Sequence, residues 1–196
     1  MPPKFKFSRE EILQAALELT RESGISAVTA RALGARLGSS AKPIFGLFEN
    51  MQEVQQEVLK AAERLYQNRL QKAMASRQYP PYKASGMAYI AFAKEERELF
   101  KLLFMRDRSH EVPEDPSSIQ PLFEEIQRNT GLGREDAFLF HLEMWVYVHG
   151  IATMVATSYL SWDMDTVSQI LTDAYLGLKH RFSEKAVSAA GNGADA

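Results

Sequence analysis

Residues 38–50 have the sequence GSSAKPIFGLFEN, and this stretch decides how the first part of the chain folds. It is too interrupted by glycine and proline for a long helix, and too aromatic for a solvated linker. One of its serines can cap a short helix, and Pro43 is tolerated in a first turn because its missing N–H would have no partner there. The pattern predicts a short helix that follows Ser39 or Ser40 and can last only until Phe48.

Two more helices are expected before this stretch. Ser8 and Glu11 have the spacing of a capping box, which predicts a helix of about four turns that ends at Gly24. Thr29 can cap a second helix, of about two turns, that ends at Gly38. Three such helices predict a helix-turn-helix, in which the last short helix is small enough to enter the major groove of DNA.

The rest of the chain is also predicted to be helical. Its hydrophobic residues recur at the helical period, and no alternating strand pattern is evident. A fourth helix is expected from Met51 to about Met74. Later helices are expected over residues 82–94, 96–107, 117–129, 134–160 and 164–182.

The expected fold is therefore all-α, with an N-terminal three-helix helix-turn-helix domain and a C-terminal helical bundle that dimerises. We place the DNA-binding domain at residues 1–56 and the ligand-binding and dimerisation domain at residues 57–182. Residues 183–196 are rich in Ala, Gly and Ser, have little apolar surface to bury, and are expected to be disordered.

The composition excludes several kinds of chemistry. The 196 residues include no cysteine, which removes Cys-ligated zinc, thiol catalysis and disulfides, and favours the cytoplasm as the compartment. The start of the chain has no apolar export signal. The apolar segment 137–160 is long enough to cross a membrane, but it contains Glu143, and an ionisable group inside a span is costly. We therefore expect a helix buried by protein, and no membrane contact.

Residues 8–59 resemble the N-terminal DNA-binding domain of the TetR family of transcriptional regulators. The resemblance implies that residues 41–47 are the recognition helix of the helix-turn-helix, the helix that contacts DNA bases. The matching residues are Ile12, Leu13, Ala15, Ala16, Leu17, Leu19, Gly24, Thr29, Arg31, Leu33, Gly34, Gly38, Ser40, Ile44, Phe45 and Phe48.

The resemblance also implies which residues contact DNA. The residues at positions that contact DNA in relatives are Thr29, Arg31, Ser40, Lys42 and Phe45. A basic arm of Lys4, Lys6 and Arg9 can follow the DNA backbone or a minor groove. The candidate DNA-contacting residues are Lys4, Lys6, Thr29, Arg31, Ser40, Ala41, Lys42, Pro43, Phe45 and Gly46.

Four positions depart from the family pattern. The family usually has a tyrosine at Phe45, a polar or basic pair at Gly46-Leu47 and a lysine at Met51. Residues 1–56 carry seven basic and six acidic side chains, a net charge of only +1, so a weak electrostatic contribution to DNA binding is expected. The spacing of Phe45 and Phe48 favours core packing, and Phe45 can serve both the core and DNA.

The C-terminal region predicts an apolar effector site. Aromatic and methionine side chains are frequent there, and most are expected simply to form core. His141, Trp145 and His149 share one helical stripe, and Trp145-x-x-x-His149-Gly150 resembles a Trp-His-Gly subgroup of the TetR family. The candidate effector-binding residues are Met87, Phe92, Phe104, Phe123, His141, Met144, Trp145, Tyr147 and His149.

No metal, cofactor or enzymatic activity is expected. Positions eight apart on one helix are about 12 Å apart, so His141 and His149 alone make a poor metal site. No Glu-x-x-His motif, phosphate loop or nucleophile motif occurs. The acidic pairs Glu95-Glu96 and Glu124-Glu125 are interpreted as solvated helix faces.

The leading hypothesis is a ligand-responsive transcriptional regulator. It would bind a palindromic double-stranded DNA operator as a homodimer, repress transcription and be released by a small apolar molecule. The alternative is a ligand-binding or protein-binding module of the same fold that no longer binds DNA. The dimer would form through the last two helices, residues 134–182, using Val146, Ile151, Val155, Tyr159, Val167, Ile170, Leu171, Ala174 and Leu178.

Overall fold

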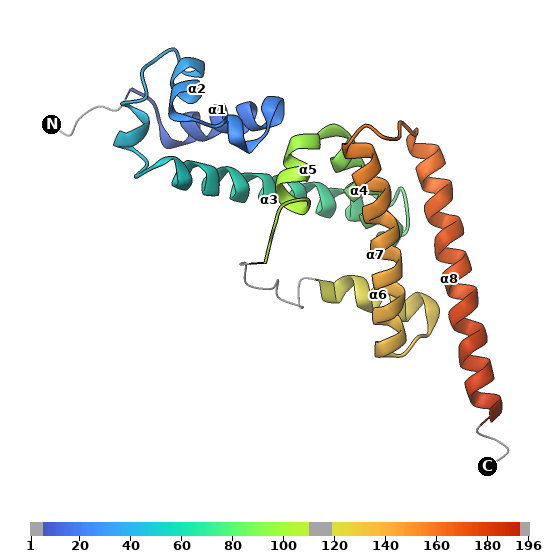
Figure 1. Ribbon diagram of the computed structural model, residues 1–196. Coiled ribbons are helices and arrows are strands. Elements are labelled where there is room, and N and C mark those ends of the chain that lie inside the picture. Colours follow the sequence, from blue (N-terminus) through green and yellow to red (C-terminus); the bar gives the residue numbers. More distant parts are fainter. Residues whose placement is uncertain (1–5, 110–118, 193–196) are drawn as a thin grey trace. The chain divides into compact units, whose positions relative to one another are not determined.

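The computed structural model describes residues 6–109 and 119–192, and the secondary structure of these residues is entirely helical (Figure 1). The all-α prediction is therefore confirmed. The α-helices are α1 (Arg9–Ser23), α2 (Ala30–Arg36), α3 (Met51–Ala75), α4 (Pro81–Glu95), α5 (Arg97–Phe104), α6 (Gln120–Thr130), α7 (Arg134–Ala156) and α8 (Met164–Asn192).

The predicted helix starts in the first part of the chain are confirmed. Ser8 and Glu11 form the capping box, in which the Ser8 hydroxyl accepts from the Glu11 N–H and the Glu11 carboxylate accepts from the Ser8 N–H. Thr29 caps α2 by accepting from the N–H of Ala32 at 3.2 Å. These local hydrogen bonds satisfy N–H groups that the first helical turn leaves unpaired.

The predicted recognition helix over residues 41–47 is wrong as an α-helix. Only a 3₁₀ turn, Ile44–Gly46, forms there. The backbone N–H groups of Ile44, Gly46 and Leu47 each bond to the carbonyl three residues earlier. The physical reason is that Pro43 has no backbone N–H to donate and Gly46 favours helix poorly, and the tighter 3₁₀ bonding suits a short piece.

The chain divides into two compact units. The first comprises Met1–Arg69 with Phe92–Arg108, and the second comprises Leu70–Ala91 with Ser109–Ala196. This division falls inside α3 and α4, whereas the sequence suggests a boundary after residue 56. The difference arises because α5 packs on α1, which adds a later part of the chain to the first unit.

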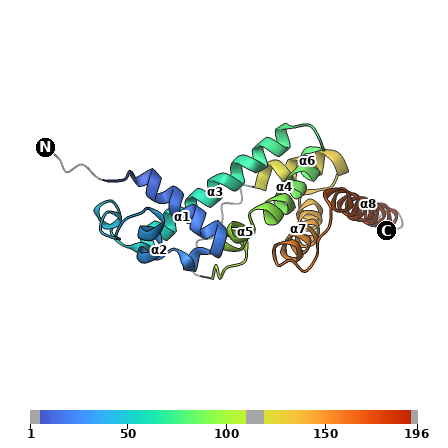
Figure 2. The same cartoon turned by 90° about the horizontal axis from the view of Figure 1, so that it is seen from above.

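The core of the first unit combines aliphatic and aromatic side chains. α1 contacts both α2 and α5 (Figure 2). Tyr66 on α3 meets the edges of Phe92 and Phe104, with ring centroids 5.3 and 5.1 Å apart. The buried residues include Ile12, Ala16, Val28, Leu33, Ile44, Phe48, Val54, Val58, Ala62, Leu99 and Phe100.

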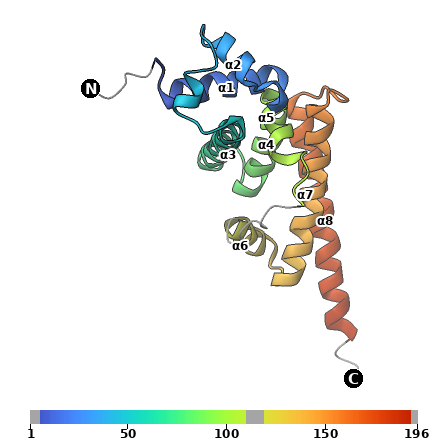
Figure 3. The ribbon, with the colours of Figure 1, turned by 60° about the vertical axis from the view of Figure 1, so that its left-hand side comes forward.

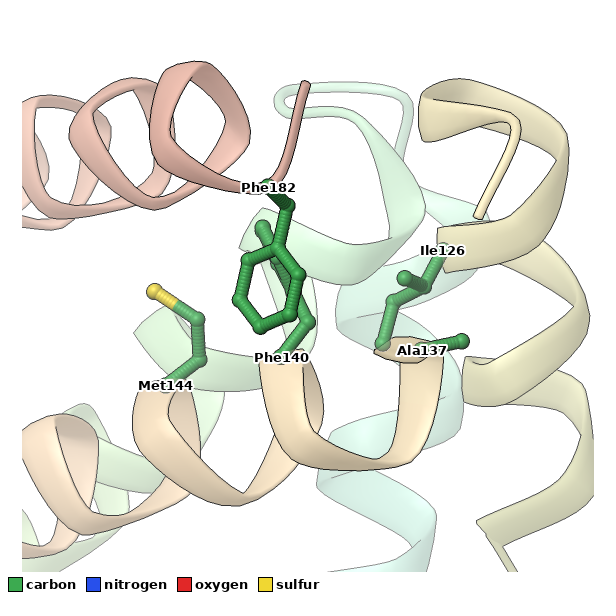
Figure 4. Packing of buried hydrophobic residues seen from close by; sticks show 5 residues of the cluster. All are labelled: Ile126, Ala137, Phe140, Met144 and Phe182. Carbon is green, nitrogen blue, oxygen red and sulfur yellow. The ribbon is translucent and has the colours of Figure 1, made fainter. Parts of the chain in front are cut away.

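The core of the second unit joins α6, α7 and α8. Ile126, Ala137, Phe140, Met144 and Phe182 form one buried cluster (Figure 4). α7 and α8 are neighbours along this cluster (Figure 3). Edge contacts between the aromatic rings add to the burial of their apolar surface.

Helix α8 differs from the sequence prediction at its end. It continues to Asn192, so residues 183–192 are helical where disorder was expected, and residues 193–196 lie outside the described part. The segment contains alanine, lysine and glutamate, which favour helix, and it follows directly on the buried anchor Phe182. The expectation of disorder gave too little weight to this anchor.

We predict that Phe182→Ala lowers the free energy of unfolding by about 3–5 kcal/mol, because the phenyl ring is 2% exposed and its loss leaves a cavity. Urea unfolding followed by circular dichroism measures the change. Glu184→Ala, at an exposed position of the same helix, is the control and should change stability by less than about 0.5 kcal/mol. Equal effects of the two substitutions would contradict the burial of Phe182.

Candidate nucleic-acid interface and effector region

Residues 39–48, here called the recognition segment, lie against α2. Gly34 of α2 makes this possible, because a Cβ built there would lie 3.0 Å from the Ser40 carbonyl carbon and 3.1 Å from the Ala41 nitrogen. The Ser39 N–H also bonds to the Gly34 carbonyl at 2.9 Å. The segment is thus attached to α2 through backbone atoms.

Two side chains anchor the recognition segment from inside. Ile44 is fully buried and Phe48 is 2% exposed, as expected for core residues. Phe45 is instead 48% exposed, so the prediction of core packing is wrong for this residue. The reason is the turn geometry, which directs Ile44 inward and its neighbour outward. Lys42 and Gly46 are also exposed, and Ala41 and Pro43 are half-buried.

The N-terminal arm reaches the same segment. The Lys6 ammonium donates to the Ser39 hydroxyl at 3.3 Å and lies 5.2 Å from the centroid of the Phe7 ring. The predicted contact residue Lys4 lies outside the described residues. Thr29 and Ser40 are exposed, and the hydroxyl of Thr29, which accepts the capping bond, still has a proton to donate.

Arg9 does not act as part of a free basic arm. Its guanidinium donates to the Leu47 carbonyl and to the Glu53 carboxylate, both at 2.7 Å, and lies 4.1 Å from the centroid of the Phe48 ring. The bond from Arg9 lowers the pKa of Glu53. Arg9 therefore fastens the recognition segment to the start of α3.

Arg36 is also paired within the protein. It bonds to Glu22 and, at 3.3 Å, to Glu18, and the pairing lowers the pKa of Glu22. Arg31, on the same helix, is exposed and has no ion pair among the described residues. Among the cations of residues 6–50, Arg9, Arg21 and Arg36 are paired within the protein, whereas Lys6, Arg31 and Lys42 are exposed and form no ion pair with another described residue.

Two glutamates at the α4–α5 junction, Glu95 and Glu96, differ in part from the sequence prediction. The prediction of a solvated face holds for Glu95, which is exposed although it forms an ion pair, but it is wrong for Glu96, whose side chain is half-buried. Glu96 receives two hydrogen bonds from Arg21 of α1, at 2.8 and 3.0 Å, and Glu95 pairs with Arg69 of α3. Helix periodicity could not show this, because both partners are distant in sequence.

Two tyrosine–histidine contacts join α4 to α7 in the second unit. The Tyr82 hydroxyl lies 3.1 Å from His141 Nδ1, and the Tyr89 hydroxyl lies 2.9 Å from His149 Nδ1. Both tyrosines are on α4 and both histidines on α7. The two tyrosines are seven residues apart and the two histidines are eight residues apart, so each pair spans about two helical turns. This matched spacing could have been found in the sequence, where neither tyrosine was selected as a site residue.

Aromatic rings surround these two contacts. Trp145 stacks on His149, with ring centroids 5.1 Å apart and planes 7° from parallel. Phe123 of α6 meets the edge of His141 at 5.1 Å. The structure thus pairs four of the predicted effector-binding residues in two separate contacts, Phe123 with His141 and Trp145 with His149.

The other predicted effector-binding residues lie elsewhere. Phe92 and Phe104 belong to the first unit, where both contact Tyr66. Met144 is part of the core cluster and Met87 is buried on α4. Tyr147 is exposed on another side of α7 from the stacked Trp145. Sequence periodicity could not separate core from site among these residues.

Burial has electrostatic consequences in this region. It lowers the pKa of His141 and of His149 and raises the pKa of Tyr82, because the charged form of each loses hydration. The histidines are therefore neutral at pH 7. The Nδ1 atom of each can form one hydrogen bond with the hydroxyl of its tyrosine. Among the described residues, no group of three or more His, Asp or Glu side chains could hold a metal ion.

One side of α7 presents apolar residues outward. Leu139, Leu142 and Val146 are exposed at helical spacing, and a Cβ at Gly150 would meet nothing within 4 Å. The predicted dimer contacts Ile151, Val155, Val167 and Leu171 are instead buried within the chain, so they are wrong as surface residues. By length and composition α7 could also cross a membrane, but core helices of soluble proteins pass the same test.

We predict that folding stability falls as the pH drops below about 6.5. Because the pKa values of His141 and His149 are lowered in the folded protein, the unfolded chain binds more protons in this range and is favoured by acid. Urea unfolding at pH 7.5 and 5.5 measures the loss. His149→Gln should reduce the difference between the two values.

The control for this prediction is His180→Gln, since that side chain is 77% exposed. It should keep the pH dependence of the wild type. A wild-type stability that is equal at both pH values, or His149→Gln and His180→Gln variants with the same slope, would contradict neutral burial of His149.

The comparisons with known proteins agree with this architecture. Residues 82–175 match the family model described as Tetracyclin repressor-like, C-terminal domain. The fold is similar to that of SmeT, described as the repressor of the Stenotrophomonas maltophilia multidrug efflux pump SmeDEF. That similarity covers 88% of this chain and 90% of SmeT, at 18% identity and a TM-score of 0.52.

No curated protein sequence matches the chain. The Trp-His-Gly subgroup is not tested by these matches and stays a prediction. Residues 82–175 thus match the C-terminal domain of Tetracyclin repressor-like proteins, and the chain shares its all-helical fold with the repressor SmeT.

Proposed function

We propose that the protein is a ligand-responsive, DNA-binding transcriptional regulator of the cytoplasm, with no enzymatic activity. It acts as a repressor, binds a palindromic operator as a homodimer and leaves the DNA when a small apolar molecule binds. The C-terminal domain match and the fold shared with a repressor support this proposal. Residues 1–56 are proposed to contain the DNA-contacting surface.

The recognition segment carries the proposal. Ile44 and Phe48 hold it from inside, Gly34 lets α2 approach its backbone, and Phe45 and Lys42 face solvent. A short, rigid segment with an outward face is what a major groove can accept. A gel shift and footprint on the DNA upstream of its own gene test the proposal, and the absence of a protected palindrome at low salt would contradict it.

The effector is proposed to bind near the tyrosine–histidine contacts of α4 and α7. The surroundings are aromatic and the two histidines are neutral, which suits a largely apolar molecule. Helix α4 contributes residues to both units, so a ligand that prefers one position of α4 can change the affinity for DNA. The effect of the ligand on DNA affinity then equals the effect of DNA on ligand affinity.

The alternative, a module that does not bind DNA, is favoured by the internal pairing of Arg9, Arg21 and Arg36. Each pairing removes a cation that could neutralise a phosphate. Retention on a duplex DNA column as a function of salt separates the alternatives. A DNA-binding protein elutes at a salt concentration well above that of a protein retained by weak charge alone.

We predict that Arg31→Ala weakens DNA binding and makes the plot of log affinity against log salt shallower by about two units, since a dimer loses two phosphate contacts. Fluorescence anisotropy over a salt series measures the slope. Arg36→Ala is the matched control on the same helix, because Arg36 is already paired with Glu18 and Glu22. A slope change for Arg36→Ala as large as that for Arg31→Ala would contradict the distinction between the exposed and the internally paired arginine.

We predict that Val146→Glu converts the dimer to a monomer, weakening association roughly a hundredfold, because it would bury an unpaired carboxylate on the apolar side of α7. Sedimentation velocity measures the result. Tyr147→Glu is the control, since this exposed neighbour points about 100° away around the helix. A monomeric wild type, or dissociation by Tyr147→Glu alone, would contradict the interface.

A further inference from the structure

We propose that Phe45 recognises the C5-methyl group of a thymine in the major groove of the operator. This inference rests on the proposed DNA-binding function and adds to it the base that the recognition segment selects. Its evidence is the geometry of the 3₁₀ turn and the chemistry of the exposed face of that turn.

The turn divides the recognition segment into an inner and an outer face. The 3₁₀ turn itself comprises only Ile44–Gly46, so the two faces are assigned from the burial of each side chain. Ile44 is buried and its neighbours three positions away, Ala41 and Leu47, are half-buried, so these form the inner face. Lys42 and Phe45 are both exposed and form the outer face.

Phe45 is an unusual side chain for an outer face. Its ring is 48% exposed, and no ring or cation contact involves it among the described residues. Phe48, three positions later, is almost fully buried and lies under the guanidinium of Arg9. Buried Ile44 and Phe48 hold the backbone on both sides of Phe45. The Phe45 ring therefore keeps its exposed position and does not fold into the core.

The chemistry of the ring limits what it can recognise. A phenyl group has no hydrogen-bond donor or acceptor, so it cannot bond to a phosphate or to the polar edge of a base. In the major groove the thymine methyl is the apolar group that distinguishes one base from another. Gly46 follows directly and adds no side chain that would hold the ring away from the base edge.

Lys42 adds a positive charge beside the proposed methyl contact. It projects from the same face as Phe45 and is exposed, so it can pair with a phosphate or with a guanine edge beside the thymine. A cation and an apolar ring on one small face match the charged backbone and the methyl group of a duplex. A minor-groove wedge would instead separate stacked bases and would not depend on the methyl group.

The test uses the full-length protein and a duplex selected by it from a random-sequence library. Each thymine is replaced in turn by deoxyuridine, which removes only the methyl group. We expect one position in each half-site at which the replacement weakens wild-type binding about three- to fivefold. Phe45→Ala should weaken binding to the thymine duplex and show no further loss with deoxyuridine at that position.

Lys42→Ala is the matched control on the same face. It should weaken binding overall while keeping the deoxyuridine penalty of the wild type. Phe45→Leu, which keeps an apolar side chain, should keep part of that penalty. Thermal unfolding of Phe45→Ala should match that of the wild type, because the ring is largely outside the core.

The outcomes separate this inference from the proposed function. Recovery of no duplex at low salt would overturn both. Binding of a duplex with no position sensitive to deoxyuridine would overturn the methyl contact and leave DNA binding intact. A deoxyuridine penalty that is equal in the wild type and in Phe45→Ala would also overturn it, since another residue would then recognise the methyl group.

Discussion

The close approach of α2 to the backbone of residues 39–41 is the contact on which the arrangement of the recognition segment depends. A Cβ at Gly34 would lie at the limit of contact with three backbone atoms, which cannot move aside as a flexible side chain can. The absence of a side chain there allows Ile44 to enter the core and turns the outer face of the segment toward solvent. The position of Phe45 and Lys42 follows from this contact.

Charge in the first unit is used mainly for internal structure. Arg9 joins the recognition segment to α3, Arg21 joins α1 to the α4–α5 junction, and Arg36 joins α2 to α1. A charge count over the sequence treats all these side chains as equivalent. In the folded unit only the exposed cations remain available for phosphates, so the proposed DNA binding would depend more on shape and apolar contact than on electrostatic attraction.

The second unit shows how much of a site can be found in advance. The stripe of His141, Trp145 and His149 was visible from helix periodicity, and the structure places Trp145 against His149. The tyrosines that bond to the histidines were not selected, because such a contact depends on how two helices are aligned. Core and site residues also looked alike, since burial of Met144 and exposure of Tyr147 depend on neighbours distant in sequence.

The sequence by itself determined the helices, most of their ends and the all-α class, because caps, glycine stops and hydrophobic periodicity act over a few residues. It also carried the family pattern of the first fifty or so residues. Only the tertiary structure decided that residues 44–46 form a 3₁₀ turn, that Phe45 faces outward and that Glu95 and Glu96 bind arginines. These features depend on contacts between segments tens of residues apart, whose energies no local pattern contains.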